Sequence, residues 1–425
     1  MPPNLTASIP CEIKDLALAD MGKRRMEWAF QTMPVLQSVR KHFITTQQFK
    51  NIRIAVCLHV TSETANLAVT LRDGGAQVVV CAADPLTVQD DAAACLVKDY
   101  GISVYAIRGA VRAAFCSHLT VSVEGRPHVV LDEGGELSAR LHARPDAAEE
   151  AFGGTEGASI SVQKLRAMAK EGALRYPVIA VNESVTSDLF DNRYGTGQST
   201  LDGILRSTNL LLAGMNVVVA GYGRCGRGIA LRAQGLGAKV IVTEVNPIRA
   251  LEALMDGPRV MSMGEAARAG DVFITATGTK NAIAREHFEK FKNGAILCNA
   301  GRGNVEIDLE TLGQMSSARR QPKEHVEEYA LRDGRRIYVL GEGRPINLAV
   351  GEGHPAPAMD IALANQALSV EHLVKHGRAL DRLVYSVPPE IDRQVAKMKL
   401  EAMSVNIDRM TLEQEYYAAG RSEAT

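Results

Sequence analysis

Nothing in this sequence of 425 residues favours a membrane or a nucleic acid as a partner. Its 48 lysine and arginine residues are balanced by 49 aspartate and glutamate residues, so no basic surplus is present to bind phosphates or anionic lipids. The longest apolar runs, such as Asn216–Ala220, are far shorter than the roughly 20 residues that span a membrane. The first ten residues lack the charged and then apolar layout of a signal peptide, which predicts a cytoplasmic protein.

Cysteines are too few and too scattered to build a disulfide framework or a zinc knuckle. The chain has seven, an odd number, and no two lie within four positions of each other. Cys57, Cys81 and Cys298 stand inside apolar, strand-like runs, which predicts small buried core residues. We therefore expect free thiols and no metal site.

The hydrophobic residues are arranged as alternating strands and helices. They make up 46% of the chain, which is long enough for two or three domains with large cores. A first series starts at the strand Ile52–Leu58 and brings Asp132 to the end of a later strand. A second series starts at Asn216–Ala220. The pattern predicts an α/β fold with two doubly wound, Rossmann-like parallel sheets. The segment Gly134–Gly157, rich in small and polar residues, is predicted to be a loop.

A glycine-rich turn after the strand Asn216–Ala220 predicts the cofactor. Gly221, Gly223 and Gly226 form a G-x-G-x-x-G pattern that follows a strand and opens a helix. Such glycines permit a tight turn, close approach of the backbone to a pyrophosphate, and packing of the helix on the strand. Glu244 closes the next strand, where a carboxylate binds both ribose hydroxyls and repels a 2′-phosphate. We therefore predict NAD rather than NADP.

Several further motifs stand in an order that resembles one known family. They are His59-Val-Thr61-Ser-Glu63-Thr, Gln89-Asp90, Leu131-Asp132-Glu-Gly-Gly135, Asn182-Glu-Ser-Val-Thr, Phe190-Asp191-Asn192, Val305-Glu306-Ile-Asp308 and Gly353-His354-Pro355. Together with the glycine-rich turn they resemble adenosylhomocysteine hydrolases from about Asp15 to Lys399. The segment Tyr194-Gly-Thr-Gly-Gln-Ser-Thr200 is similar to the shorter microbial form.

The resemblance implies a domain plan and a reaction. Residues 1–192 and 354–404 are expected to form a substrate domain hinged to an NAD domain, 193–353, with 405–425 as a C-terminal tail. The family implies a homo-oligomer, a homotetramer or a dimer, acting on an adenine nucleoside. In its reaction the 3′ carbon is oxidised by NAD, and the ketone acidifies the 4′ proton. Removal of that proton expels the 5′ substituent, water adds, and the ketone is reduced again.

The resemblance also assigns site residues. The catalytic candidates are His59, Asp132, Asp191, Ser187, Arg302 and His354. The substrate-binding candidates are Thr61, Glu63, Gln89, Gly157, Asn192 and Met359. The residues expected to contact NAD are Gly221, Gly223, Arg224, Cys225, Gly226, Glu244, Asn246, Thr277, Gly278, Asn299, Gly301 and Asn347.

Some of these residues also suit their roles on physical grounds. His59 and Asp132 at strand ends suit acid–base catalysis at the 4′ and 5′ positions. Glu63 could accept hydrogen bonds from the exocyclic amine of adenine. Each also has a plainer interpretation. Asp132 would cap a turn, His59 would be a core histidine, and Thr61 or Glu63 would simply start a helix.

Three positions depart from the family's pattern on the sugar side. Ser187 stands where the family has a lysine that helps to remove the 3′-hydroxyl proton, and Asp188 beside it points elsewhere if the segment is extended. Gly157 replaces a sugar-binding carboxylate, which leaves space near the ribose. Arg302 replaces a histidine. The adenine pair, the acid–base pair and the NAD turn are retained.

Four functions remain open on this pattern. The leading hypothesis is a nucleoside dehydratase that eliminates water to an exocyclic alkene, as found in angustmycin-type antibiotics, whose added hydroxymethyl group suits the space at Gly157. An ordinary adenosylhomocysteine hydrolase is the second, with Asp191 or a water held by Ser187 replacing the lysine. Other redox chemistry on nucleosides is the third, and a non-catalytic, NAD-loaded regulatory protein that pairs with a true hydrolase is the fourth.

Overall fold

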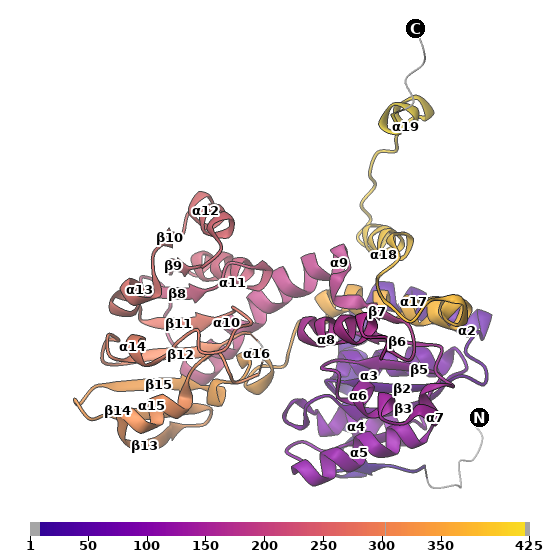
Figure 1. Cartoon of the computed structure of the whole chain (residues 1–425), viewed down its shortest axis with the longest axis horizontal. Helices are drawn as coiled ribbons and strands as arrows, with labels where there is room; N and C mark the ends of the chain where they lie inside the picture. Colours follow the sequence, from indigo (N-terminus) through magenta and orange to yellow (C-terminus); the bar gives the residue numbers. More distant parts are fainter. Residues whose placement is uncertain (1–8, 302, 421–425) are drawn as a thin grey trace.

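The computed structural model describes residues 9–301 and 303–420, which form two lobes joined by a hinge (Figure 1). Each lobe is built around an eight-stranded sheet in the described residues. Helices cover the sheets on both sides, so the predicted α/β fold with two Rossmann-like parallel sheets is confirmed. The chain crosses between the lobes twice, because strand β16 (Val384–Ser386) returns to the first sheet.

The first sheet is parallel throughout, in the order β1-β4-β3-β2-β5-β6-β7-β16. Its other strands are β1 (Glu12–Ile13), β2 (Arg53–Leu58), β3 (Gln77–Ala82), β4 (Ser103–Ala106), β5 (Val129–Asp132), β6 (Gly153–Glu156) and β7 (Val178–Ala180). The order reverses between β2 and β5, and ligands of open α/β sheets bind at the carboxyl ends of strands at such a point.

Two hydrophobic cores flank this sheet. One core packs beneath α1 (Ala19–Gln31), α2 (Pro34–Thr46), α3 (Ser62–Asp73), α4 (Asp90–Lys98), α17 (Ala356–His376) and α18 (Pro389–Ala402). The other packs beneath α5 (Arg112–Glu124), α6 (Glu136–His142), α7 (Pro145–Ala148) and α8 (Ser159–Lys170). Cys57 and Cys81 are fully buried in the second core, as predicted, and Cys298 is buried in the other lobe.

The second sheet has the order β10-β9-β8-β11-β12-β15-β14-β13 and ends in an antiparallel hairpin that the sequence did not predict. Its strands are β8 (Asn216–Ala220), β9 (Lys239–Thr243), β10 (Arg259–Val260), β11 (Val272–Thr275), β12 (Ala295–Asn299), β13 (Ser316–Lys323), β14 (Val326–Leu331) and β15 (Arg336–Leu340). Its helices are α10 (Thr196–Thr208), α11 (Arg224–Gly235), α12 (Pro247–Met255), α13 (Met263–Ala269), α14 (Arg285–Phe288), α15 (Leu309–Met315) and α16 (Ile346–Ala349). The order reverses between β8 and β11, beside the glycine-rich turn.

The prediction of a loop over Gly134–Gly157 is wrong, because the segment contains α6, α7 and the buried strand β6. Strand β6 reads Gly-Gly-Thr-Glu, and glycine disfavours strands in general. Here bulky neighbours require it. A Cβ at Gly153 would lie 2.6 Å from a methyl carbon of Leu373, and one at Gly154 would lie 3.2 Å from the ring of Tyr176. Tertiary packing therefore decides this strand.

The first crossing between the lobes is helical. Helix α9 (Val185–Ser187) continues into a π-helical segment, Asp188–Gly195, and then into α10. The side chain of Ser184 caps α9 by accepting the Ser187 N–H at 3.1 Å. The assumption of an extended segment around Ser187 is therefore wrong.

A C-terminal arm with helix α19 (Leu412–Ala418) extends away from the first lobe (Figure 1). Its apolar side chains are exposed; they include Val405, Ile407, Met410, Leu412, Tyr416 and Tyr417. No helix of the described residues is long and apolar enough to cross a membrane.

We predict that Gly228→Ala destabilises the second lobe. A Cβ at Gly228 would overlap the carbonyl oxygen of Arg193 in the π-helical segment, so α11 has to move away from the hinge. Overpacking of this kind costs about 1–3 kcal/mol, which denaturant unfolding measures. Gly235→Ala is the matched control, because a Cβ at this end of α11 meets nothing within 4 Å. Equal stabilities of the two variants would contradict the close contact.

Candidate active site

The turn between β8 and α11 leaves a cradle of backbone at the N-terminus of α11. Gly221 has a φ of +92°, and a Cβ there would lie 2.7 Å from the carbonyl oxygen of Ala276. A Cβ at Gly226 would overlap the carbonyl oxygen of Gly221, so the helix packs directly on the strand end. At Gly223 the nearest atom to a Cβ is Nη1 of Arg249, 3.6 Å away. The nearest neighbour of Gly223 is thus the far end of a flexible arginine, so the backbone here, beside the helix N-terminus, fits the pyrophosphate of a dinucleotide.

Glu244 lies directly after β9, and its carboxylate accepts three backbone N–H groups. The donors are Tyr222 at 2.6 Å, Val245 at 2.7 Å and Asn246 at 3.0 Å. Burial raises the pKa of Glu244, but these bonds outweigh burial, and the pKa lies below its ordinary value. The carboxylate is therefore ionised and fixed beside the cradle. The Asn246 side chain caps α12 by accepting two N–H groups of its first turn.

Glu306 organises the loop opposite the cradle, although the sequence marked it only as part of a family motif. Its fully buried carboxylate accepts the N–H groups of Thr277 at 2.9 Å and Gly278 at 2.8 Å. It also accepts the Thr277 hydroxyl at 2.8 Å. A Cβ at Gly301 would overlap the same carboxylate. Three residues that we expected to contact NAD are thus positioned by one buried carboxylate beneath them.

Asn299 and Asn347 connect this loop to the hinge. Asn299 Oδ1 accepts the Gly301 N–H at 2.7 Å, and its Nδ2 donates to the carbonyl oxygen of Gly343 at 3.0 Å. Asn347 Nδ2 lies 3.1 Å from Nε2 of His354, while Asn347 Oδ1 is buried without a hydrogen-bond partner. A buried acceptor without a partner is costly, and the carboxamide of a bound nicotinamide carries a donor that satisfies it. The residues present therefore fit NAD.

Asp191 and His354, one from each chain crossing, meet at the hinge. A short hydrogen bond joins Asp191 Oδ1 to His354 Nδ1, and His354 Nε2 lies 3.2 Å from Thr196 Oγ1. Burial lowers the pKa of His354, but the Asp191 carboxylate outweighs burial and raises it. Asn192, next to Asp191, reaches the other lobe, because the Cys225 thiol donates to its Oδ1 at 3.5 Å. The predicted residues of both lobes therefore meet here.

Ser187 does not join this group, and its neighbour Asp188 pairs with the NAD-binding lobe. Asn365 Nδ2 donates to the Ser187 hydroxyl at 3.2 Å, and both side chains are buried. Asp188 pairs with Arg224 at the start of α11 and accepts Asn192 Nδ2 at 3.1 Å. The Arg224 side chain, which we expected to contact NAD, is therefore paired with the hinge.

His59 and Asp132 lie at the carboxyl ends of the adjacent strands β2 and β5, where the strand order reverses. With 24% of its side chain exposed, His59 is not a core histidine; its Nδ1 lies 2.7 Å from Thr87 Oγ1 and its Nε2 lies 3.9 Å from Glu133 Oε1. Asp132 is fully buried. Its Oδ2 accepts the Ser138 N–H at 2.7 Å, and its Oδ1 has no partner. Burial raises the pKa of Asp132.

Thr61, Glu63 and Gln89 gather at the start of α3. The Thr61 hydroxyl caps the helix by accepting the Thr64 N–H at 3.5 Å, so its plainer role as a helix-start residue is confirmed. Gln89 Oε1 accepts the Ser62 N–H at 2.8 Å. Glu63 is buried, which raises the pKa of its carboxyl group, and the Ser62 hydroxyl donates to it at 3.0 Å. A role for these residues in adenine binding stays a prediction.

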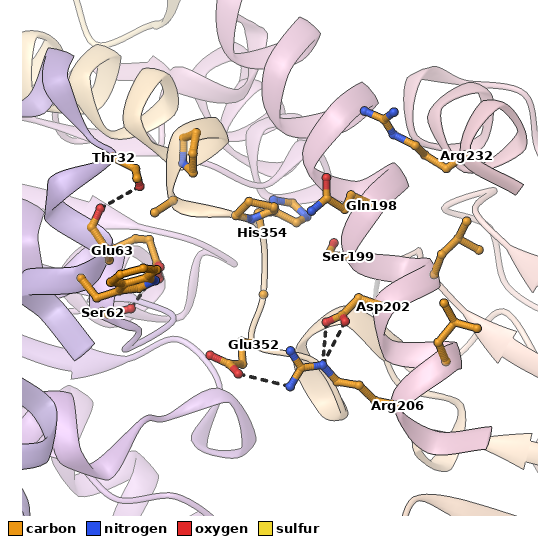
Figure 2. Close-up of a pocket in the computed structure, with 18 of the residues that line it drawn as sticks. Thr32, Ser62, Glu63, Gln198, Ser199, Asp202, Arg206, Arg232, Glu352 and His354 are labelled. Atoms are coloured by element: carbon orange, nitrogen blue, oxygen red, sulfur yellow. Dashed lines mark hydrogen bonds and ion pairs between the residues drawn. The ribbon is translucent and has the colours of Figure 1, made fainter. Parts of the chain in front are cut away.

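A cleft of about 780 Å³ opens between the lobes beside the hinge (Figure 2). Ser62 and Glu63 line one side, Gln198 and Ser199 line the other, and His354 lies between them. The two walls come from different lobes, but the residues of the glycine-rich turn do not line the cleft.

Of the described catalytic and substrate-binding candidates, Glu63 and His354 line this cleft, and the others do not. Met359 packs against the core of the first lobe. Asp132 is fully buried at the end of β5. Gly157 lies beside the Glu133 side chain, which would be 3.6 Å from a Cβ. Arg302 lies outside the described residues. Within residues 9–301 and 303–420, no three His, Cys, Asp or Glu side chains form a group that could hold a metal ion.

The fold and site define a two-lobed, NAD-binding α/β protein whose glycine-rich turn contacts the segment that carries Asp191 and Asn192 at the hinge. Residues 192–353 match the family model "S-adenosyl-L-homocysteine hydrolase, NAD binding domain", and residues 10–152 match "S-adenosyl-L-homocysteine hydrolase". The chain belongs to the adenosylhomocysteine hydrolase family, and NAD is its cofactor.

Curated relatives match along nearly the whole chain. The adenosylhomocysteinase of Aquifex aeolicus is 54% identical over 407 residues, which cover 96% of this chain and 97% of that protein. The adenosylhomocysteinase of Gloeobacter violaceus is 50% identical over 415 residues, which cover 97% of each chain. The transhydrogenase of Sinorhizobium meliloti is a distant structural match, with a TM-score of 0.42 and 13% identity over 76% of this chain and 96% of that one.

We predict that Glu244→Ser weakens NAD binding by about tenfold or more, because charge-assisted hydrogen bonds to ribose contribute about 1.5–3 kcal/mol each. Glu244→Arg should in addition admit NADP, since it replaces repulsion of the 2′-phosphate with attraction. Titration calorimetry with both dinucleotides measures this. Glu252→Gln, on the outer helix α12, is the control and should bind NAD normally. Equal affinity of the unmodified chain for NAD and NADP would defeat the assignment.

Proposed function

We propose that this chain is a nucleoside dehydratase that acts on an adenine nucleoside through reversible oxidation of its 3′ carbon. Between oxidation and reduction, water is lost across the 4′ and 5′ carbons, which leaves an exocyclic alkene. Membership of the family supports an adenosine-type substrate. The observation that supports dehydration is the replacement of the family lysine by Ser187 on the sugar side of the site.

The surroundings of Ser187 and Gly157 support dehydration in place of hydrolysis. The Ser187 hydroxyl is buried against Asn365 and provides no amine base. At Gly157 a Cβ would be in van der Waals contact with the Glu133 side chain, 3.6 Å away, and the absence of the carboxylate that the family carries here supports room for a sugar substituent. A hydroxymethyl group on the sugar, as in angustmycin-type nucleosides, suits that space.

The residues have distinct parts in this reaction. Bound NAD supplies the redox chemistry at the 3′ carbon. Asp191, held by His354, orients the ribose hydroxyls, and Asp191 or a water held by Ser187 takes the 3′-hydroxyl proton as hydride leaves. With the 3′ carbon as a ketone, the 4′ proton becomes acidic and passes to ionised Asp132. His59 gives a proton to the 5′ oxygen as the bond between the 5′ carbon and that oxygen breaks, so the oxygen leaves as water.

Hydrolysis of adenosylhomocysteine is the second candidate. The 54% identity to the Aquifex aeolicus adenosylhomocysteinase favours it directly. The same oxidation and 4′ proton loss would then expel homocysteine, and water would add to the 5′ carbon. Asp191 or a water held by Ser187 would receive the 3′-hydroxyl proton.

Two further expectations belong to this proposal. A homo-oligomer, as a tetramer or dimer, is supported by the exposed apolar side chains of the arm that contains Ile407, Leu412 and Tyr417. The cytoplasmic location stays a prediction.

We predict that Asp132→Asn and His59→Ala block the steps after oxidation. Asparagine keeps the shape of Asp132 and its bond from the Ser138 N–H but cannot accept the 4′ proton. In Asp132→Asn, exchange of the 4′ hydrogen with deuterated water, followed by NMR on the NAD-loaded protein, should fall by at least about a hundredfold. In His59→Ala, formation of the alkene should fall instead, because His59 acts at the 5′ oxygen. Unchanged exchange in Asp132→Asn would remove this residue from the reaction.

We predict negligible homocysteine release by the unmodified chain and a gain in the double variant Gly157→Glu, Ser187→Lys. The new amine would take the 3′-hydroxyl proton, and each tenfold gain in rate corresponds to about 1.4 kcal/mol of barrier. The control Gly157→Gln, Ser187→Met adds similar bulk without charge and should gain nothing. Assays use adenosylhomocysteine and a panel of adenine nucleosides, with products identified by mass spectrometry. Robust hydrolysis by the unmodified chain would overturn the dehydratase and establish the second candidate.

A further inference from the structure

Two carboxyl groups lie next to each other in the core of the first lobe. Asp132 on β5 and Glu156 on β6 are paired in register. Parallel neighbours stand ~4.8 Å apart, with side chains of paired residues on the same face of the sheet. Both residues are fully buried. Only Asp132 has a part in the reaction proposed above, so the second carboxyl group requires an explanation.

Each carboxyl group has one oxygen bound by the backbone and one oxygen without a partner. Asp132 Oδ2 accepts the Ser138 N–H at 2.7 Å. Glu156 Oε1 accepts the N–H groups of Gly134 at 3.0 Å and Ala158 at 2.7 Å. Asp132 Oδ1 and Glu156 Oε2 are buried with no hydrogen-bond partner. Two ionised oxygens left in this state inside a core would be strongly destabilising.

No positive charge among the described residues neutralises the pair. The titratable groups that face it are the Cys57 thiol from β2, the Glu133 carboxylate after β5 and the Tyr176 hydroxyl before β7. Ser138 of α6 and Ser161 of α8 are uncharged. Burial, with the Asp132 charge as the next cause, raises the pKa of Glu156 to about 8. Burial raises the pKa of Asp132 as well.

We propose that Asp132 and Glu156 hold one proton between them at neutral pH, carried on Glu156, and that Glu156 is thereby the positioning residue of Asp132. The proton removes the repulsion between the two like charges. Asp132 stays ionised, and its remaining lone pairs are left for a proton from the substrate. The shared proton needs no substrate; only its use in catalysis rests on the proposed function.

Infrared spectroscopy of the NAD-loaded protein tests the shared proton directly. The carbonyl stretch of a protonated carboxyl group should be present at pH 7 and be lost as the pH rises through about 8. Glu156→Gln should lack this band, whereas Glu371→Gln should keep it, because Glu371 is ion-paired with Lys375. If Glu156→Gln does not fold, Asp132→Asn removes the repelling charge and should move the loss of the band to lower pH. Absence of the band in the unmodified protein, or an unchanged titration in Asp132→Asn, overturns the proposal.

The pH profile of 4′-hydrogen exchange tests whether Glu156 is protonated while Asp132 works. Glutamine replaces a neutral carboxyl group with a neutral amide, so Glu156→Gln should keep the acid limb of the profile in place. It should also lose a second transition near pH 8. If Glu156 were ionised, its removal would lower the pKa of Asp132 and move the acid limb by about one unit or more. That shift would overturn the proposal. If the infrared band is present but no nucleoside shows exchange of its 4′ hydrogen, the proposed function is contradicted, whereas the shared proton of Asp132 and Glu156 is supported.

Discussion

The hydrogen bond between Asp191 and His354 is the contact on which the rest of the site depends. One partner lies in the first crossing between the lobes and the other lies in the second, so the bond ties both crossings together. His354 Nε2 also lies beside Thr196 and Asn347, on the NAD side of the hinge. His354 therefore links Asp191, which we predict to bind the ribose, to Thr196 and Asn347 of the NAD-binding lobe. The Asp191 carboxylate also raises the pKa of His354.

Around this contact, both sheets present their carboxyl edges at points where the strand order reverses. In the second lobe this edge carries the glycine-rich turn and Glu244. In the first lobe it carries His59 and Asp132. Buried carboxyl groups support both edges: Glu306 holds the loop at Thr277, and Glu156 lies beside Asp132. In the proposed reaction, NAD would be held by the second lobe and proton transfer would be carried out by residues of the first lobe.

The sequence predicted those parts of the molecule that depend on local chemistry. The turn from Gly221 to Gly226 was recognisable because the sequence pattern of the turn itself indicates why glycine is required there. Strand β6 was missed, since its glycines are required by Leu373 and Tyr176, which are distant in the sequence. The helical geometry at Ser187 was missed for a similar reason, because its cap and its Asn365 partner exist only in the folded chain.

Buried carboxylates were the least predictable part of the site. Glu306 and Glu156 mainly bind backbone N–H groups, and a lone glutamate in a sequence carries no sign of such a role.

The central claim, that the site oxidises the 3′ carbon of a nucleoside, is tested most directly by absorbance. NAD-loaded protein is mixed with adenosine or 3′-deoxyadenosine, and reduced nicotinamide is followed. The account predicts the absorbance of reduced nicotinamide with adenosine and none with the 3′-deoxy compound. No signal with any adenine nucleoside, or equal signals from both, would contradict it.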